Sequence, residues 1–134
     1  MIYALDSNAI IEIINKNATV STHRNNALNQ GAGFVIPSVV DYEIWRGFHC
    51  RPAPTKEKIY LSICDDCSII EMTAEIWKRS ARIYADLRSK GRTVDDPDIF
   101  IAATCIENGY TLVTHNTKHF EGISDLLIED WQEA

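Results

Sequence analysis

Short runs of apolar residues alternate along the chain with longer segments in which apolar residues recur every three or four positions. Short apolar runs bounded by turn residues are typical of buried strands, and the longer spacing is typical of amphipathic helices. The runs that predict strands are Ile2–Leu5, Gly33–Ile36, Ser68–Met72, Thr111–Thr114 and Leu126–Ile128. Because these runs are apolar throughout rather than alternating, they indicate a parallel sheet that is covered on both faces.

Helix boundaries follow from capping residues, glycines and prolines. The predicted helices are Asn8–Asn15, Val20–Asn29, Ser38–Phe48, Thr55–Cys64, Thr73–Lys90 and Asp96–Asn108, followed by a short helical turn that contains His119. Ser7 and Thr73 are predicted to cap the first and the fifth of these helices. Ser38 and Asp41 have the spacing of a capping box. Asp96 is the better N-cap of the last helix, because a proline follows it at the first helical position.

Strands that alternate with helices predict one α/β domain, and a length of 134 residues suits a single domain spanning residues 1–134. The expected architecture is a three-layer α/β/α domain with a central, mainly parallel sheet of four to five strands. In such sheets the functional groups gather beyond the carboxyl ends of the strands, near the point where the strand order reverses. Asp6 ends the first strand and Asn116 follows the fourth, so we expect both at the same edge of the sheet.

The net charge of −6 is unusual for a nucleic-acid-binding protein, because phosphate contacts normally use Lys and Arg. Six of the thirteen basic residues are nevertheless concentrated in one stretch: Lys78, Arg79, Arg82, Arg88, Lys90 and Arg92. This stretch is either a surface that contacts nucleic acid or a solvated helix face. No apolar run is long enough to cross a bilayer, and the first residues lack the basic region of a signal peptide. We therefore expect a cytoplasmic protein without a membrane partner.

Four cysteines raise the question of a metal site or a disulfide: Cys50, Cys64, Cys67 and Cys105. Cys64 and Cys67 have CxxC spacing, but no second pair of cysteines or histidines completes a zinc set. In a reducing cytoplasm we expect all four to be free thiols that behave as small apolar side chains.

Four oxygen-bearing residues come just after a strand or near the start of a helix: Asp6, Glu43, Asp98 and Asn116. Hard divalent cations such as Mg²⁺ or Mn²⁺ bind through oxygen ligands, and they polarise phosphodiesters and activate water. Carboxylates packed closely together repel one another when no metal is bound, and this unfavourable arrangement is the mark of a binding site.

Each of these residues also has a purely structural interpretation, which the sequence leaves open. Asp6 is a suitable cap for the helix that follows it. Glu43 lies in the middle of a helix, where a partly exposed glutamate is common. Asp98 in the first turn of a helix is stabilised by the helix dipole whatever its function. Asn116 is a common turn residue after a strand.

Four stretches resemble the motifs of the PIN-domain family. Tyr3–Asn8 resembles the opening motif, an apolar strand followed by Asp-Thr-Asn, and Ile36–Gly47 resembles the second motif, which ends in Glu-x-x-x-Gly. Gly91–Ala103 is similar to the third motif, with Asp four residues before Ala-Ala, and Tyr110–Phe120 is similar to the fourth. The ending Leu127–Trp131 is similar to that of VapC toxins of VapBC toxin–antitoxin systems. Order, spacing and length agree, so the resemblance spans essentially the whole chain.

The resemblance implies a metal-dependent endoribonuclease, the toxin component of a type II, VapBC-like toxin–antitoxin system. Such enzymes hydrolyse RNA phosphodiester bonds, with transfer RNA prominent among their substrates. By the resemblance, Asp6, Glu43 and Asp98 are the acids that bind Mg²⁺ or Mn²⁺, and Asn116 occupies the fourth, variable position. All four are expected to be catalytic.

Two residues depart from the family pattern. Ser7 stands where threonine is usual, and we expect its hydroxyl to keep the supporting hydrogen bond. His119 stands where the family has an acid, which leaves open whether one or two ions act in catalysis. Asp95 and Asp96 compete with Asp98 for its place in the site.

The resemblance also implies partners: a cognate VapB-like antitoxin with a basic segment, and a second copy of the chain in a homodimer or a larger toxin–antitoxin hetero-oligomer. The helices Thr55–Cys64 and Thr73–Lys90 are candidate dimer surfaces. They carry more apolar side chains than one buried stripe needs, among them Ile76, Trp77, Ile83, Tyr84 and Leu87. The alternative is that these side chains belong to the core. The alternative function is a catalytically inactive PIN-like module that binds RNA or protein, favoured by Asn116 and His119.

Overall fold

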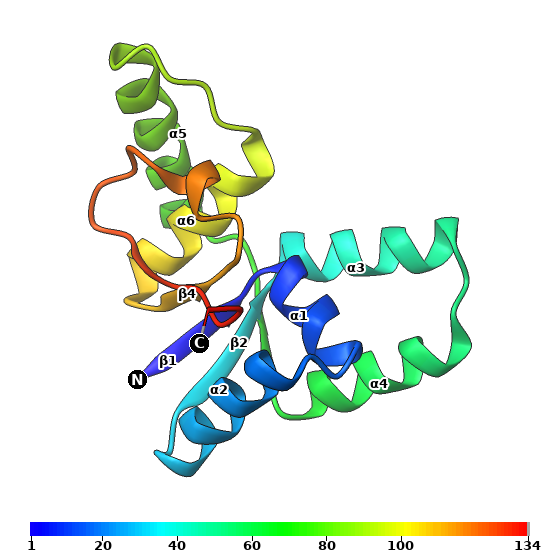
Figure 1. Ribbon diagram of the computed structural model, residues 1–134. Helices are drawn as coiled ribbons and strands as arrows, with labels where there is room; N and C mark the ends of the chain where they lie inside the picture. Colours follow the sequence, from blue (N-terminus) through cyan, green and yellow to red (C-terminus); the bar gives the residue numbers. More distant parts are fainter. Residues whose placement is uncertain (134) are drawn as a thin grey trace.

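A central parallel sheet organises the molecule, as the computed structural model of residues 1–133 shows (Figure 1). Its five strands lie in the order β3-β2-β1-β4-β5, and all four pairings are parallel. The strands are β1 Ile2–Leu5, β2 Gly33–Pro37, β3 Ser68–Ile70, β4 Thr111–Val113 and β5 Leu127–Glu129. The predicted parallel sheet is confirmed.

Helices cover both faces of this sheet. They are α1 Ser7–Ile14, α2 Ala18–Asn29, α3 Ser38–Cys50, α4 Pro54–Asp65, α5 Ala74–Ser89 and α6 Asp96–Asn108, with a 3₁₀ turn η1 at Thr117–Phe120. The first four lie on one side of the sheet, and α5 and α6 lie on the other (Figure 1). The chain steps from β1 to β3 in one direction and returns across the sheet to β4. Right-handed crossovers then place the two sets of helices on opposite faces, which gives the predicted three layers.

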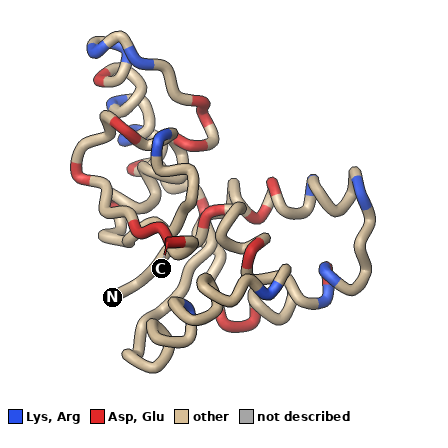
Figure 2. Tube along the Cα trace, viewed as in Figure 1, with Lys and Arg blue, Asp and Glu red and all other residues tan. Residues whose placement is uncertain are grey.

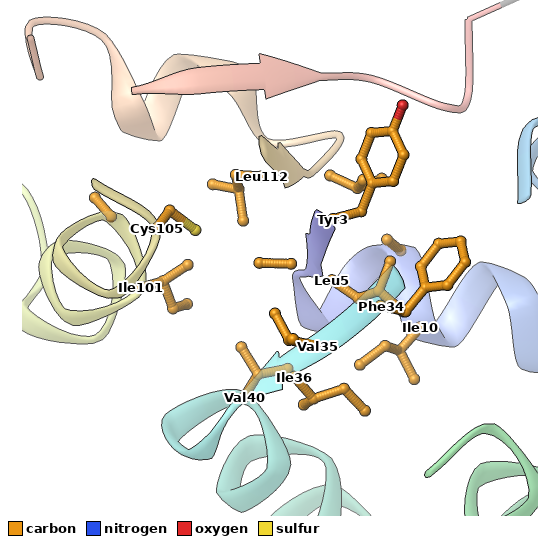
Figure 3. Packing of buried hydrophobic residues seen from close by; sticks show 14 of the residues in the cluster. Tyr3, Leu5, Ile10, Phe34, Val35, Ile36, Val40, Ile101, Cys105 and Leu112 are labelled. Carbon is orange, nitrogen blue, oxygen red and sulfur yellow. The ribbon is translucent and has the colours of Figure 1, made fainter. Parts of the chain in front are cut away.

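The core lies against the three central strands. Ala4, Ile36 and Leu112, one from each of these strands, are fully buried. Figure 3 shows Ile101 and Cys105 projecting from α6 toward one face of the sheet, while side chains of α1 approach from the opposite side. Burial on both faces explains why these strands read as continuous apolar runs.

The edge strands differ by a few residues from the prediction. The third strand was expected to reach Met72 but ends at Ile70, because its partner ends there too: Ile70 pairs with Pro37, and α3 begins at the next residue. The fifth strand was expected at Leu126–Ile128 but spans Leu127–Glu129, in the register that pairs Val113 with Glu129.

Three predicted helix caps are wrong, while the cap at Thr73 is confirmed. The residue that caps α1 is Asp6, whose carboxylate accepts from the backbone of Ser7. The N-cap of α6 is Asp95 rather than Asp96. The capping box of α3 does not form, because Asp41 instead accepts a hydrogen bond of 2.6 Å from the Tyr60 hydroxyl and so ties α4 to α3.

The apolar side chains of α5 divide between core and surface. Ile76, Ile83 and Leu87 are buried, so for these three the core interpretation is right. Trp77 and Tyr84 are about half exposed, at 50% and 49%. Within residues 1–133, all four cysteine thiols are free, and no helix is long and apolar enough to span a membrane. The homodimer stays a prediction.

Candidate metal-binding active site

The candidate site lies at the carboxyl ends of β1 and β4, where the direction of strand progression reverses. A pocket of about 210 Å³ opens there. Its lining residues are Asp6, Ser7, Glu43, Asp95, Pro97, Asp98, Asn116 and His119. The structure therefore brings together all four residues that the sequence predicted, from the junction of β1 and α1, from α3, from α6 and from the loop after β4. We call this hollow the acidic pocket.

Asp6 is the most firmly held residue of the acidic pocket, and it is 4% exposed. Its Oδ1 accepts from the Ser7 backbone amide at 2.8 Å. Its Oδ2 accepts from the Thr114 hydroxyl at 2.8 Å and from the Asn8 side-chain amide at 3.2 Å. Capping α1 and lining the site are thus compatible, because one carboxylate has enough lone pairs for both.

Two residues without a predicted role hold the site together. Thr114 is buried, and its hydroxyl oxygen also accepts from the Asn116 backbone amide at 3.1 Å. Asn8 accepts from the His115 backbone amide at 2.9 Å, which ties the start of α1 to the loop after β4. Ser7 supports Asp6 through its backbone amide, and the hydroxyl that supports Asp6 belongs to Thr114, so the expected hydrogen bond of the Ser7 hydroxyl stays a prediction. The sequence carries one signal for Asn8 and Thr114, since both are polar and come just after a strand.

Glu43 reaches the acidic pocket from α3. Its Oε1 atom is buried and has no hydrogen-bond partner within residues 1–133. A buried acceptor without a partner is unfavourable by about 1–3 kcal/mol, and more when it is charged. The buried Oε1 is therefore available to bind a cation, or to accept a hydrogen bond from a water that a cation holds.

Asp98 comes from the first turn of α6, and its Oδ2 lies 3.3 Å from Nδ1 of His119. Asp98 lies in the first turn of α6 and also lines the acidic pocket, so its place at the helix start is compatible with a role in the site. Asp95 also lines this pocket, and Asp96 is not among the lining residues. Of the three neighbouring acids, Asp95 and Asp98 are therefore placed to serve the site, and the role of Asp98 as a ligand stays a prediction.

The carboxyl groups of the three predicted metal ligands all have raised pKa values. Burial raises the pKa of Asp6 above its ordinary value, although the hydrogen bond from Thr114 offsets part of this effect. Burial and the charge of Asp6 raise the pKa of Glu43, and the same two causes raise the pKa of Asp98. Carboxyl groups in this state bind a proton or a metal ion more favourably than isolated carboxyl groups do.

The donor set fits a hard divalent cation. Within residues 1–133, no three His, Cys, Asp or Glu side chains are already close enough to enclose an ion by themselves. Mg²⁺ does not need such a cage, because it typically binds through one or two carboxylates and keeps several waters. Asp6 and Asp98 are the residues suited to direct contact, and Glu43 is suited to contact the ion or its water. Oxygen donors alone do not suit a structural zinc ion.

A sequence model described as PIN domain matches residues 3–126. The chain belongs to the PIN-domain family. This PIN domain is 31% identical to the tRNA(fMet)-specific endonuclease VapC of Shigella flexneri, over 96% of this chain and 97% of that protein. It is 28% identical to the ribonuclease VapC2 of Rickettsia felis, over 99% and 100% of the two chains.

Solved structures agree with the fold of this PIN domain. A chain in the crystal structure of Rickettsia felis VapBC2 bound to a promoter DNA fragment superposes with a TM-score of 0.85 and is 28% identical. The match covers 98% of this chain and 99% of that one. The resemblance inferred from the motifs and the three-layer architecture are both confirmed.

Proposed function

We propose that this PIN domain is the toxin of a VapBC-type toxin–antitoxin pair and that it hydrolyses RNA phosphodiester bonds with Mg²⁺ or Mn²⁺ bound in the acidic pocket. The observation that carries the proposal is the convergence of Asp6, Glu43 and Asp98 from three separate elements on one pocket. Relatives that match nearly the whole chain are named as ribonucleases and as an endonuclease, which supports the same reaction.

Different residues of the pocket would bind the cation, orient the water and position the phosphate. Asp6 and Asp98 would hold the cation, and Thr114 and Asn8 keep the Asp6 carboxylate in a fixed orientation. When bound, the cation supplies Lewis-acid polarisation of the phosphate and a water of lowered pKa. Glu43 would orient that water through its free Oε1. Asn116, exposed at the rim, would position the scissile phosphate by donating from its side-chain amide.

Partners follow from the same assignment. Two solved relatives, from Rickettsia felis and Salmonella typhimurium, are VapBC complexes at 28% and 26% identity, which supports a VapB-like antitoxin as the partner of this chain. A basic segment of such an antitoxin would compete with the cation for the acidic pocket, because both are attracted by the same carboxylates. Cytoplasmic location, a homodimer and a larger hetero-oligomer remain predictions.

The second candidate function is a catalytically inactive PIN-like module that binds RNA or protein. The contact between His119 and Asp98 favours it, because a protonated histidine there would occupy the place of a cation. Titration calorimetry with Mn²⁺ separates the two functions. The nuclease requires a Mn²⁺ site that Asp98→Asn removes, and the inactive module requires no such site.

The proposed function is tested by incubating the purified chain with a pool of transfer RNA. Discrete fragments are expected with Mg²⁺ or Mn²⁺ and no fragments with EDTA. Fragments that persist in EDTA contradict metal-dependent hydrolysis. Absence of fragments together with absence of Mn²⁺ binding would instead establish the inactive module.

A further inference from the structure

Two further pockets open beside the acidic pocket and share parts of its wall. The first shares Ser7 and Glu43 with it and lies between α1, α3 and α4; we call it the α3-side pocket. The second shares Asp95, Asp98 and His119 with it and lies between the loop before α6 and the η1 turn; we call it the η1-side pocket. The acidic pocket is therefore flanked by a hollow on each side.

The α3-side pocket combines an apolar wall with a cationic rim. Its volume is about 340 Å³. The large apolar side chains that line it are Ile11, Ile14, Ile44 and Phe48. Arg46, Arg51 and Lys56 supply the positive charge, and the Arg46 guanidinium lies over the Tyr42 ring at 5.2 Å. An apolar hollow of a few hundred Å³ with a few charged groups at its rim suits a small planar group such as a nucleobase.

The η1-side pocket is smaller and more polar, with a volume of about 220 Å³. Beyond Asp95 and Asp98, which it shares with the acidic pocket, its lining holds the cations Arg92 and Lys118 and the hydroxyl of Thr93. Arg92 lies 3.4 Å from Glu121, but both side chains are exposed, so this ion pair contributes little and is easily exchanged for another anion. The η1-side pocket therefore suits a phosphate group rather than a base.

Most of the cations that line the two flanking pockets lack an ion-pair partner in the described part of the chain. Among residues 1–133, six of the thirteen Lys and Arg side chains lie within 4.0 Å of a carboxylate. The seven without such a partner in this part of the chain are Lys16, Arg46, Arg51, Lys56, Lys58, Arg88 and Lys118. Four of these seven line the two flanking pockets. Blue segments on the α3–α4 arm and at η1 mark their surroundings in Figure 2.

The basic stretch that the sequence singled out has a different role over most of its length. Four of its six residues form ion pairs on the surface of α5 and α6: Lys78, Arg79, Arg82 and Lys90. Arg79, for example, lies 2.7 Å from Glu107. For these four the solvated-helix interpretation holds. Arg92 is the member of the stretch that reaches the surroundings of the acidic pocket.

We propose that single-stranded RNA crosses the acidic pocket with one unstacked nucleotide in the α3-side pocket and a neighbouring phosphate on Arg92 and Lys118. This inference rests on the proposed function and specifies how its substrate is held. Single-stranded RNA is recognised where cations follow the backbone and where bases rest against apolar or guanidinium faces. Both features occur here, one on each side of the carboxylates.

Charge complementarity selects a polyanion over a basic peptide for this path. Along this path, cations of the α3-side pocket come first, the carboxylates of the acidic pocket lie in the middle, and cations of the η1-side pocket follow. A phosphodiester strand meets cations in both flanking pockets and a bound metal ion between them. A basic peptide would be attracted only at the centre and would be repelled by Arg46, Arg51, Lys56 and Lys118.

The experiment measures binding rather than cleavage. Every variant carries Asp98→Asn, so that the probe stays intact and the cations of the two flanking pockets are compared without a bound metal ion. Fluorescence anisotropy reports the Kd for a short fluorescein-labelled oligoadenylate. Lys56→Ala and Lys58→Ala are a matched pair, because both lysines are exposed on α4 and without an ion pair in the described chain, yet Lys56 lines the α3-side pocket. Lys56→Ala and Lys118→Ala are each expected to raise the Kd by roughly 3- to 10-fold, and to lower the slope of log Kd against log salt by about 0.7. Lys58→Ala should change neither.

A second probe separates the base from the phosphate. Ile11→Ala removes exposed apolar surface from the α3-side pocket, so it should weaken binding of oligoadenylate but not of the same strand made abasic. Lys118→Ala should weaken binding of both strands. Equal Kd values for the Lys56, Lys58 and Lys118 variants overturn the path, even where metal-dependent cleavage by the parent chain persists. The path is also overturned if Lys56→Ala weakens antitoxin binding and leaves the Kd for RNA unchanged.

Discussion

The hydroxyl of Thr114 donates to Asp6 Oδ2 at 2.8 Å and joins two residues that are 108 positions apart in the sequence. Both side chains are almost completely buried. Asp6 follows β1 and Thr114 follows β4, so the parallel pairing of these strands is what brings the two groups together. The central acid of the site is thus oriented by the sheet itself.

Removing that hydroxyl should slow catalysis without unfolding the chain. Thr114→Val keeps the side-chain shape but deprives Asp6 and the Asn116 amide of a partner. Loss of a group that orients a metal ligand typically costs 10- to 100-fold in activity or metal affinity, and we expect kcat to fall within this range. Thr114→Ser keeps the hydroxyl and is the control. Equal kcat values for the two variants would show that the hydrogen bond does not position Asp6.

Glu43→Gln should abolish cleavage and stabilise the metal-free chain. The pKa of Glu43 is raised above its ordinary value of 4.5 by burial, by Asp6 and by Asp98, so its charge is unfavourable in the folded protein. Such a group contributes stability below its ordinary pKa and loses it as the pH rises through the folded pKa. The Tm of Glu43→Gln in EDTA should therefore exceed that of the parent by ~2–5 °C at about pH 7.5, with the difference shrinking near about pH 4.5. A Tm difference that stays constant across this pH range would contradict the charge repulsion between Glu43 and the neighbouring carboxylates.

We expect one tightly bound ion per chain. His119 places a nitrogen 3.3 Å from Asp98 Oδ2, where it can donate a proton or carry positive charge but adds no negative charge for a second cation. Calorimetry with Mn²⁺ should give a stoichiometry of one. His119→Asp should tighten binding by roughly tenfold, since affinity for divalent cations rises with the number of charged oxygen ligands. Two sites of similar affinity in the parent would rule out this account of His119.

The four cysteines should differ widely in reactivity. Cys50 is exposed, whereas burial raises the pKa of Cys67 to about 11 and that of Cys105 to about 12. Because the thiolate is the reactive form, iodoacetamide at neutral pH should modify Cys50 first. Intact-mass spectrometry should then show one rapid addition, which Cys50→Ser removes. Rapid modification of Cys105 in the native chain would contradict its burial.

Much of the fold was readable from local pattern because the central strands are buried on both faces and are therefore apolar throughout. The predicted site residues followed from the topology of parallel sheets, which collects the ends of strands at one edge. The motif resemblance then assigned roles to Asp6, Glu43 and Asp98, and the structure brings these residues into one pocket.

What the sequence did not reveal depends on contacts between distant segments. The role of Thr114 requires knowing that β4 lies beside β1. The length of β3 depends on where Pro37 ends its neighbour. The pairing of Arg79 with Glu107 requires knowing how α5 packs on α6, and it converts part of a basic run into a neutral surface. None of these relationships is encoded by spacing along one segment.

We propose the acidic pocket as the catalytic site of a metal-dependent ribonuclease. The most direct measurement is cleavage of a transfer-RNA pool in Mg²⁺ or Mn²⁺ by Asp98→Asn and by Asp96→Asn. Both acids lie in the first turn of α6, but only Asp98 lines the pocket. Asp98→Asn is expected to abolish the fragments, and Asp96→Asn is expected to leave them unchanged. Cleavage by Asp98→Asn at the parental rate would contradict the proposal.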